Sequence, residues 1–499
     1  MRITQQLSEI INEVEKKKVF TTHQRIIYKK ILKIKQKSKN AFIQDNDLKI
    51  IPFLKTKKII LEENCDSISN QGLEYLAGVE KIILKNILSI TNAGMKYLQK
   101  AKYISISLCP LINLSSFSFF KNVCNLRYES QKKISLTSEI CLPLNNLKVL
   151  SLQYSSIYDF SGLKELSNLE KINLSHVDTL VDEDLQYIPN VKSLSINYTY
   201  ITGTGFKYLK NLKTLKANSC RILTDNFKYL TSLEHLVNNY SDKKIFNNLS
   251  YLKNLKTLEI NNRKDISDEK ISHLKNIERL VLSNTLVNFG IKCIGLTAIK
   301  YLDLSGCRNI TSSIFSCLTN LDTLILDTCD INNTFLKHLP KRLKKISLSR
   351  CQKINGAGMK YLSNLSSLDI SYTNVNNFSL GYLSLLDEIN ISSCKSVDDN
   401  GMQYLSKIKI VKAAKINLSD SGVCHLKNAK YLDISFSLVT DKGLENMKHL
   451  EKLKIIGCQN INGSGFIHLS NIKEINWQAK NSSIKKLQEE LADRFVNLF

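Results

Sequence analysis

The feature that most constrains the fold of this chain is a repeat of 21 or 22 residues that runs through most of its 499 residues. Each unit opens with an apolar anchor residue, which we number position 1. The clear anchors are Leu147, Leu169, Val191, Leu212, Leu233, Leu255, Ile277, Ile299, Leu321, Leu343, Leu365, Leu386, Ile408, Ala429, Leu450 and Ile472. Weaker units extend the series back to anchors near Thr56, Val79, Ala101 and Val123, which gives about 20 repeats. Self-similarity at a fixed period of this length is typical of solenoids, in which each repeat is one structural unit.

The unit reads L-x-x-L-x-L-S-x-C-x-x-I-x-x-x-G-M-x-Y-L-x-N, and IKYLDLSGCRNI (299–310) is one of its best examples. The apolar residues at positions 4 and 6 alternate with polar ones, which predicts a short strand with one buried face. The segment that follows predicts a turn and a short helix. A single unit is too small to bury its own apolar side chains, so neighbouring units must share one interior. We therefore expect Leu302, Leu324 and Ile346 to lie in one continuous core.

This pattern resembles the leucine-rich repeat family, whose L-x-x-L-x-L-x-x-N/C-x-L core it matches almost residue for residue. The cysteine at position 9 and the downstream Gly-Met or Gly-Leu make it similar to the cysteine-containing repeats of F-box/leucine-rich-repeat proteins. The resemblance implies an α/β repeat solenoid: a curved horseshoe with a parallel concave sheet, short convex helices or turns, and helical caps at both ends. We expect a basic N-terminal helical cap over 1–46, the solenoid over 47–478 and a C-terminal capping helix over 479–499.

The segment NGAGMKYL (355–362) follows a predicted strand and opens a helical stretch, which is how a phosphate-binding loop begins. However, glycine recurs at the equivalent place in many repeats: Gly72, Gly94, Gly162, Gly205, Gly358, Gly401, Gly422, Gly443 and Gly465. A phosphate site would need one such glycine, whereas a repeated one is typical of turn chemistry. We therefore expect no nucleotide site and no other cofactor.

Many of the 13 cysteines recur at position 9 of the repeat. They are Cys109, Cys220, Cys307, Cys329, Cys351, Cys394 and Cys458, and Asn64, Ser155, Thr199, Ser241, Thr285, Thr373 and Ser437 hold the same position elsewhere. The small side chains shared by this position predict a buried structural ladder. No closely spaced Cys pairs indicate a zinc site, and no Ser/His/Asp or Cys/His grouping indicates catalysis. We expect no metal ligand, no catalytic residue and no enzyme.

The N-terminal segment carries acidic residues and has no apolar core of the kind found in secretory signals, and no apolar run is long enough to cross a bilayer. The cysteine count is odd. Together these features favour a reducing compartment. We therefore expect an intracellular protein, most simply a cytoplasmic one, that is neither secreted nor transmembrane.

The net charge of +25 invites binding to nucleic acid or an anionic membrane. Yet 60 of the 70 basic residues are Lys, whereas phosphate and base recognition favours the Arg fork. An AT-rich genome explains such a composition equally well. Position 2 alternates in sign over six consecutive repeats: Glu234, Lys256, Glu278, Lys300, Asp322 and Lys344. In a parallel stack these side chains are neighbours, so we expect a cross-strand charge ladder.

Positions 5, 7 and 8 predict a protein-binding surface on the concave face. Positions 5 and 7 are mostly small and polar, and position 8 is aromatic in several repeats; exposed aromatics over a polar sheet are typical of protein-binding surfaces. The candidate residues are Tyr154, Tyr198, Tyr240, Tyr372 and Phe436 at position 8, together with the acids Asp303, Asp327, Asp369 and Asp433. The alternative is that the aromatic residues only cover the turns below them.

The function that these patterns favour is a non-catalytic scaffold that recognises a protein partner and no small-molecule substrate. One alternative is a substrate-recognition adaptor of a ubiquitin ligase, although residues 1–46 lack the Leu-Pro opening and the tryptophan of an F-box. Another alternative is nucleic-acid or anionic-lipid binding through the Lys-rich surface. Two units depart from the repeat and predict structural or functional breaks: 123–146, which is too long, and 408–422, which has Ile416 at position 9.

Overall fold

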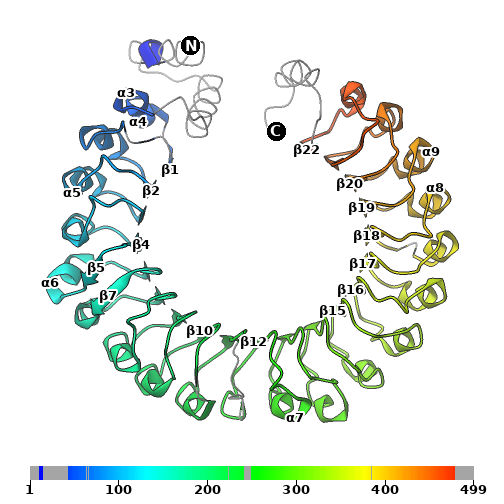
Figure 1. The fold of residues 1–499 in the computed structure, drawn as a ribbon, viewed down its shortest axis with the longest axis horizontal. Coiled ribbons are helices and arrows are strands. Elements are labelled where there is room, and N and C mark those ends of the chain that lie inside the picture. Colours follow the sequence, from blue (N-terminus) through cyan, green and yellow to red (C-terminus); the bar gives the residue numbers. More distant parts are fainter. Residues whose placement is uncertain are drawn as a thin grey trace. The chain divides into compact units, whose positions relative to one another are not determined.

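The structure is a computed structural model, and it describes residues 11–14, 43–54, 56–62, 65, 67–222, 224–240, 249–383 and 385–477. The chain divides into two compact units, Met1–Asn254 and Leu255–Phe499, which we call unit 1 and unit 2. In each unit taken by itself, the strands lie on the inner side of a curve and the short helices lie on its outer side (Figure 1). This arrangement is the predicted repeat solenoid.

Unit 1 contains a parallel sheet in which each repeat supplies one strand that begins at position 3. Its strands are β1 (Lys58–Glu62), β2 (Lys81–Lys85), β3 (Tyr103–Ser107), β4 (Asn125–Glu129), β6 (Val149–Ser151), β8 (Lys171–Asn173), β9 (Ser193–Ser195), β10 (Thr214–Lys216) and β11 (His235–Val237). Two further strands, β5 (Lys133–Ser135) and β7 (Ser156–Asp159), form a separate parallel pair. The first four strands have five residues, and β6 and the later strands of the sheet have three.

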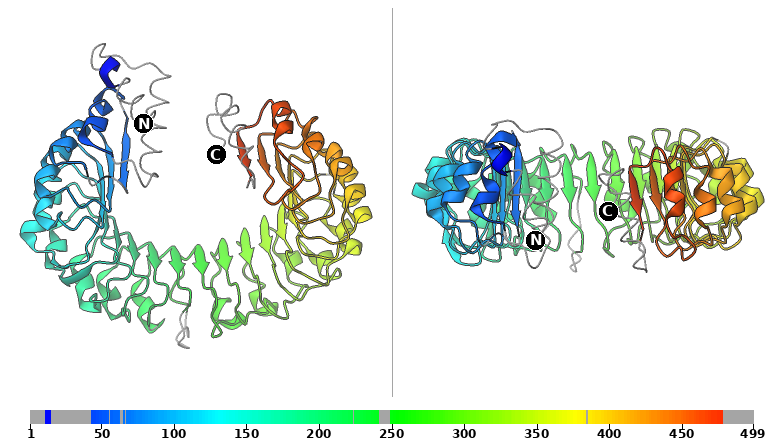
Figure 2. Two further views of the ribbon diagram at one scale, coloured as in Figure 1. Left: turned by 45° about the horizontal axis from the view of Figure 1, so that its top comes forward. Right: turned by 90° about the horizontal axis from the view of Figure 1, so that it is seen from above.

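Unit 2 is more regular, because all of its strands have three residues and pair in parallel without a register shift. They are β12 (Thr257–Glu259), β13 (Arg279–Val281), β14 (Tyr301–Asp303), β15 (Thr323–Ile325), β16 (Lys345–Ser347), β17 (Ser367–Asp369), β18 (Glu388–Asn390), β19 (Ile410–Lys412), β20 (Tyr431–Asp433), β21 (Lys452–Lys454) and β22 (Glu474–Asn476). Leu302 pairs with Leu324, which pairs with Ile346, and all three are at most 3% exposed. The predicted shared interior is therefore confirmed. Figure 2 shows the strands of each unit side by side, with the helical segments behind them.

After each strand the chain runs back along the outer side through short helices, most of them 3-10 helices. In unit 1 they are α3 (Asp45–Leu48), α4 (Ile51–Leu54), η1 (Gln71–Leu76), α5 (Asn92–Met95), η2 (Lys96–Leu98), η3 (Leu114–Phe119), α6 (Ser138–Cys141), η4 (Leu142–Leu144), η5 (Ser161–Glu165), η6 (Asp182–Tyr187), η7 (Thr204–Tyr208) and η8 (Thr224–Tyr229). In unit 2 they are α7 (Asp268–Ile271), η9 (Ile291–Cys293), η10 (Phe315–Cys317), η11 (Phe335–His338), η12 (Gly356–Leu362), η13 (Asn377–Tyr382), α8 (Asp399–Met402), η14 (Gln403–Leu405), α9 (Asp420–Val423), η15 (Cys424–Leu426), η16 (Asp441–Leu444) and η17 (Ser464–His468).

The recurrent glycine before each helical turn has a different role from the one that the sequence predicts. All nine of these glycines are described, and none has a positive φ, so no turn conformation requires them. Instead, a Cβ on Gly205 would lie 2.0 Å from the carbonyl oxygen of Asp182 in the preceding repeat, and one on Gly465 would lie 2.5 Å from that of Asp441. The prediction of turn chemistry is therefore wrong, because the close approach of consecutive repeats is what excludes a side chain.

In several repeats the residue that the glycine approaches also caps the next repeat with an acidic or amide side chain, a pattern that the sequence interpretation missed. Asp182 accepts hydrogen bonds from the N–H groups of Thr202 (2.9 Å), Gly203 (2.8 Å) and Gly205 (3.0 Å). Asp441 does the same for residues 462, 463 and 465 in unit 2. These carboxylates satisfy backbone donors that the short helices leave without an intrahelical acceptor.

The ladder at position 9 has the predicted structural role. The thiol of Cys307 donates to the carbonyl of Leu282, at position 6 of the preceding repeat (3.2 Å), and that of Cys351 donates to the carbonyl of Leu326 (3.1 Å). A small side chain is not general at this position, however. Arg263 occupies it while only 2% exposed, and it binds the carboxylate of Asp265 through two nitrogens, at 3.0 and 2.8 Å. A buried Arg is tolerated there because its charge is paired.

The unit 123–146 is irregular, as predicted, although the main sheet of unit 1 continues through its strand β4. Tyr128 and Glu129, the last two residues of β4, pair with β3, whereas only the first three residues of β4 pair with β6. The N–H of Ser130 then donates to the side chain of Ser155 (3.1 Å). Beyond it, Lys133–Ser135 forms β5 beside β7. The extra residues thus lead the chain out of the main sheet.

The predicted caps fall mostly outside the described residues. The segment 479–499 lies outside them, and only residues 11–14 and 43–46 of the predicted N-terminal cap are described. Residues 11–14 are helical, with Ile11 and Val14 buried. Asp45 of α3 already behaves as a repeat residue, because it accepts from the N–H of Ser69 (2.8 Å). The adaptor alternative, which depends on residues 1–46, stays a prediction.

Candidate binding surface

Position 8 has the same backbone conformation in all the described repeats except the irregular unit 123–146, where Ser130 occupies it. In the other repeats it lies just after the strand and adopts a left-handed φ of about +54° to +72°, whichever residue occupies it. At Tyr198, for example, φ is +57°, and its N–H donates to the carbonyl of Asn218 in the next repeat (2.9 Å). Asn262, Asn284, Gly306 and Gly457 hold the equivalent place elsewhere. These are residue types that tolerate a positive φ, whereas a bulky residue rarely adopts it.

In unit 1 the aromatic candidates form a stacked row along this position. The ring of His176 lies between those of Tyr154 and Tyr198, with centroids 4.4 and 4.5 Å away and interplanar angles of 21° and 16°. Tyr154 and Tyr198 are 54% and 50% exposed. Tyr240, further along unit 1 at the same position, is 58% exposed. The sequence interpretation missed His176, although its spacing of 22 residues from each of Tyr154 and Tyr198 was a visible signal.

In unit 2 the two aromatic candidates lie beside cations from the same row. The guanidinium of Arg350 lies 4.2 Å from the ring centroid of Tyr372, and the ammonium of Lys415 lies 5.0 Å from that of Phe436. Arg350 and Lys415 are themselves position-8 residues with a positive φ. Each contact is a cation–π pair between adjacent repeats.

The acidic candidates are less available to a binding partner than the aromatic ones, because they are partly buried and already hydrogen-bonded. Asp303 and Asp369 each accept from the N–H and hydroxyl of the serine two residues later, and Asp327 accepts from Ser347 and Ser349 of the next repeat. All three are half-buried. Asp433, which we expected to be exposed, is 7% exposed and pairs with Lys454 at 3.2 Å, so that prediction is wrong.

Burial and neighbouring charge act on the pKa of Asp327. Burial raises it, hydrogen bonds from Ser347 and Ser349 lower it, and the carboxylates of Asp369 and Asp303 raise it further; the net direction is upward. The acids therefore form a partly desolvated, like-charged cluster within the sheet of unit 2.

The charge ladder at position 2 is confirmed where it is described. Lys300 pairs with Glu278 at 2.8 Å, and Lys344 approaches Asp322 at 4.0 Å. The pattern extends to Lys213–Glu234 in unit 1, at 3.0 Å. Because most of these side chains are about half exposed, each pair contributes little to stability. The pairs do, however, neutralise many of the lysines that line this side of the sheet.

Other kinds of site find little support in the described part of the chain. No group of three or more His, Cys, Asp or Glu side chains there could hold a metal ion. Burial raises the pKa of several thiols, with the carboxylates of Glu165 and Asp159 adding to the effect at Cys141, whose pKa reaches about 12. Such thiols stay protonated and are poor nucleophiles. Across the same residues, no helix has both the length and the apolar character that crossing a membrane requires.

Comparison with known proteins identifies the fold. No protein-family model matches the sequence, and no curated protein sequence matches it. Among solved structures, the chain is similar to TLR13 in its complex with ssRNA13, with 17% identity, a TM-score of 0.53, and coverage of 81% of this chain and 80% of that one. It also matches the mouse RP105/MD-1 complex (18% identity, TM-score 0.49, 85% and 71% covered) and the internalin inlF from Listeria monocytogenes str. 4b F2365 (19% identity, TM-score 0.43, 65% and 89% covered). At these identities the likeness concerns the fold alone. The chain has the leucine-rich-repeat fold.

Proposed function

We propose that this protein is a non-catalytic scaffold that binds a protein partner through the position-8 row, with the stacked residues Tyr154, His176 and Tyr198 as the central contact. The observation that carries the proposal is the conformation of the tyrosines. They are half exposed and occupy a left-handed backbone conformation that Asn or Gly adopts at equivalent positions of the same chain. A bulky residue in that conformation costs about 1–2 kcal/mol relative to its usual backbone. Strained residues that the fold does not require are typical of functional sites.

Stacking with His176 offsets part of this cost, at about 0.5–1.5 kcal/mol for each aromatic pair. It also holds the rings in one orientation, so little side-chain freedom is lost when a partner binds. Large, rigid aromatic groups of this kind are the usual anchors of protein interfaces. The acids Asp303, Asp327 and Asp369 contribute polar complementarity in unit 2, in keeping with their half-buried, hydrogen-bonded state.

Affinity purification with mass spectrometry tests the proposal. The bait variants are wild type, the double variant Tyr154→Asn/Tyr198→Asn, and the control Tyr382→Asn. Asn suits the left-handed backbone, so the double variant keeps the fold, and Tyr382 is comparably exposed, at 53%, but belongs to η13 on the outer side. We expect specific partners to be lost from the double variant and retained by the control. Partners retained equally by all three baits would refute the role of the row.

A second candidate is single-stranded nucleic acid, since the solved TLR13 structure is a complex with ssRNA13 and this chain carries a net charge of +25. The Arg350–Tyr372 and Lys415–Phe436 pairs resemble the cation and aromatic surfaces on which bases stack. Against it, the rings of unit 1 already face one another, and many lysines are paired with acids. Binding of a labelled single-stranded RNA, measured as salt is raised, separates the two. If RNA binding weakens steeply as salt is raised and is the same in wild type and in Tyr154→Asn/Tyr198→Asn, the binding reflects charge alone.

A further inference from the structure

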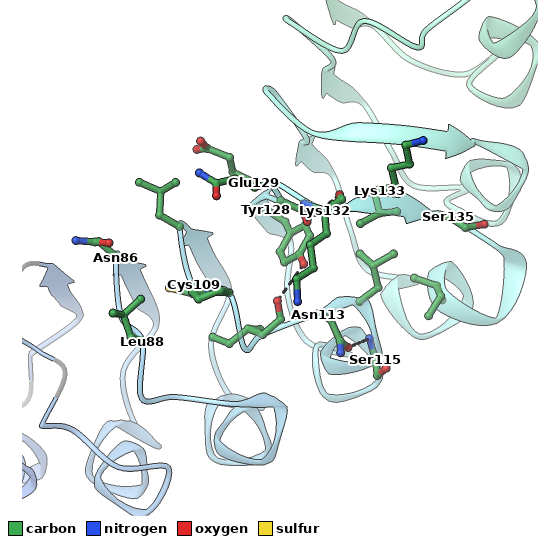
Figure 3. Close-up of a pocket in the computed structure, with 18 residues that line it drawn as sticks. Asn86, Leu88, Cys109, Asn113, Ser115, Tyr128, Glu129, Lys132, Lys133 and Ser135 are labelled. Atoms are coloured by element: carbon green, nitrogen blue, oxygen red, sulfur yellow. Dashed lines mark hydrogen bonds between the residues drawn. The ribbon is translucent and has the colours of Figure 1, made fainter.

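A pocket lies at the irregular unit of the chain. A cavity of about 590 Å³ opens in unit 1 between the loop after β3 and the segment that follows β4. Its lining includes Leu88, Leu108, Ile112, Tyr128 and Ile134, with Lys132 at the edge. In Figure 3, Tyr128 and Lys132 form one wall, and Leu88 and Cys109 lie opposite them. Cavities of this size lined mainly by apolar side chains are typical of binding sites.

The origin of the pocket is the departure of the chain from the sheet at Ser130. In regular repeats the N–H of position 8 donates to the backbone of the next repeat, as Tyr154 donates to the carbonyl of Ser175 (3.1 Å). The Ser130 N–H instead reaches the Ser155 side chain, and residues 133–135 pair with β7. The segment that would cover the loop after β3 is thereby drawn away from it.

The walls of the pocket are apolar and partly exposed to solvent. Leu88 and Leu108 are 53% and 36% exposed, and Leu108 is the position-8 residue of its repeat, with φ of +54°. Tyr128 also lines the pocket but is only 3% exposed, and its hydroxyl donates to the carbonyl of Ile112 (3.1 Å). A leucine at a left-handed position is no better suited to the fold than the asparagine at the equivalent Asn86. The apolar wall is therefore not a requirement of the backbone.

The polar edge of the pocket indicates what kind of molecule it would take. β5 belongs to a two-stranded sheet, so among the described strands one of its edges has no strand beside it, and Lys133, Ile134 and Ser135 of β5 all line the pocket. Exposed strand edges bind extended peptides by adding a strand, while pockets select the alternate side chains. Lys132 and Lys133 at the rim outnumber the one acidic lining residue, Glu129, which gives the edge a net positive charge.

We propose that this pocket binds an extended peptide segment of a protein partner, with one large apolar side chain of the peptide in the cavity and an acidic residue beside Lys132 and Lys133. The peptide main chain lies along the free edge of β5. The proposal rests on the proposed function, because it assumes that the chain binds proteins. It adds a second recognition site with a stated chemistry, separate from the aromatic row.

The experiment is a selection of displayed linear dodecapeptides on the full chain, followed by fluorescence anisotropy of the enriched peptides. The pocket variants are Leu108→Asn and Lys132→Glu/Lys133→Glu, and the control is Tyr382→Asn, an exposed residue of η13 on the outer side that belongs neither to the pocket nor to the aromatic row. Asn favours a positive φ, so Leu108→Asn should leave the melting temperature unchanged or raise it. We expect enriched peptides to share a large apolar residue near Asp or Glu. Their dissociation constants should rise at least tenfold in both pocket variants and stay within twofold in Tyr382→Asn.

Several outcomes would overturn the proposal. They are a selection that enriches no common sequence, enriched peptides that bind both pocket variants as well as wild type, and peptides that are basic rather than acidic. Displacement of the peptides by dodecanoate at micromolar concentration would assign the pocket to a small amphipathic acid instead. If peptides bind as expected but the purified partners ignore Tyr154→Asn/Tyr198→Asn, the pocket stands and the role of the aromatic row fails. If the purified partners are lost from Tyr154→Asn/Tyr198→Asn but no peptide binds as expected, the pocket proposal alone fails.

Discussion

The position-8 rows of the two units share one backbone conformation but differ in side chains. In unit 1 three consecutive repeats carry Tyr154, His176 and Tyr198, which stack, whereas in unit 2 three consecutive repeats carry Asn262, Asn284 and Gly306. The φ angles are alike, between about +56° and +68°, so the repeat dictates the conformation and leaves the residue type open. Where the fold leaves a choice and the sequence uses the less compatible residue, a role other than folding explains it best. The capping acids Asp182 and Asp441, by contrast, accept equivalent backbone hydrogen bonds in both units.

The largest effect that we expect concerns these capping acids and should be equal in the two units. Asp182→Ala in unit 1 and Asp441→Ala in unit 2 each remove the acceptor of three backbone N–H groups. Each should lower the free energy of unfolding by about 3 kcal/mol, because buried donors without a partner are costly. Denaturant midpoints measure this, with the exposed Asp178→Ala as a control expected to change stability by less than about 0.5 kcal/mol. A large loss of unfolding free energy in one unit alone would show that the capping carboxylates do not stabilise both units in the same way.

The next effect concerns the glycines that face the capping residues. Gly205→Ala and Gly465→Ala force a Cβ against the backbone of Asp182 and Asp441, and we expect each to cost about 1–3 kcal/mol. The matched control is Gly295→Ala, where a Cβ meets nothing within 4 Å, and a small gain of up to about 1 kcal/mol is expected there. Thermal melting of the variants distinguishes them. Equal melting temperatures for Gly205→Ala and Gly295→Ala would mean that the close approach is not a constraint.

An exchange of side chains between the two rows tests the comparison directly. Asn284→Tyr should cost about 1 kcal/mol, since it places a bulky residue in the left-handed conformation without a ring beside it. Tyr198→Asn should change stability by less than about 0.5 kcal/mol, because relief of strain and loss of stacking with His176 nearly cancel. Denaturant unfolding of both variants provides the values. A cost well above 1 kcal/mol for Tyr198→Asn would make the row a structural element and weaken the binding proposal.

The smallest effect separates two kinds of acid within unit 2 by their response to pH. Burial acts to raise the pKa of Asp399, but hydrogen bonds from Ser419, Ser421 and Gly422 outweigh it and the net shift is downward. Its contribution is therefore present near neutrality and lost as pH falls through the lowered pKa. Asp399→Asn should destabilise at pH 7, and the difference from wild type should shrink toward pH 3.

Asp327 should behave in the opposite way, since burial, the largest influence, and neighbouring carboxylates raise its pKa. Its ionised form is disfavoured in the folded protein, so Asp327→Asn should stabilise at pH 7 and become neutral once the wild-type carboxyl is protonated. Both effects should stay below about 1 kcal/mol. Melting temperatures between pH 3 and pH 7 give the two slopes, and slopes of the same sign would contradict the assignment.

Much of the fold could be predicted because the repeat copies one local pattern. The burial of Leu302 and Leu324, the ion pair of Lys300 with Glu278 and the thiol of Cys307 all follow from position within the unit. The candidate site was predictable only in part. Tyr198 was identified from its residue type, whereas His176 was overlooked because a histidine does not stand out until its neighbours are known to stack on it.

The sequence alone determined the period, the parallel pairing and the shared core, because these depend on which positions of each unit are apolar, and that is written in every copy. Only the tertiary structure decided why the glycines are needed, that position 8 is left-handed, and that the unit 123–146 leaves a cavity. These features arise from how closely one repeat approaches the next. That distance is set by packing between segments about 22 residues apart, which no local pattern specifies.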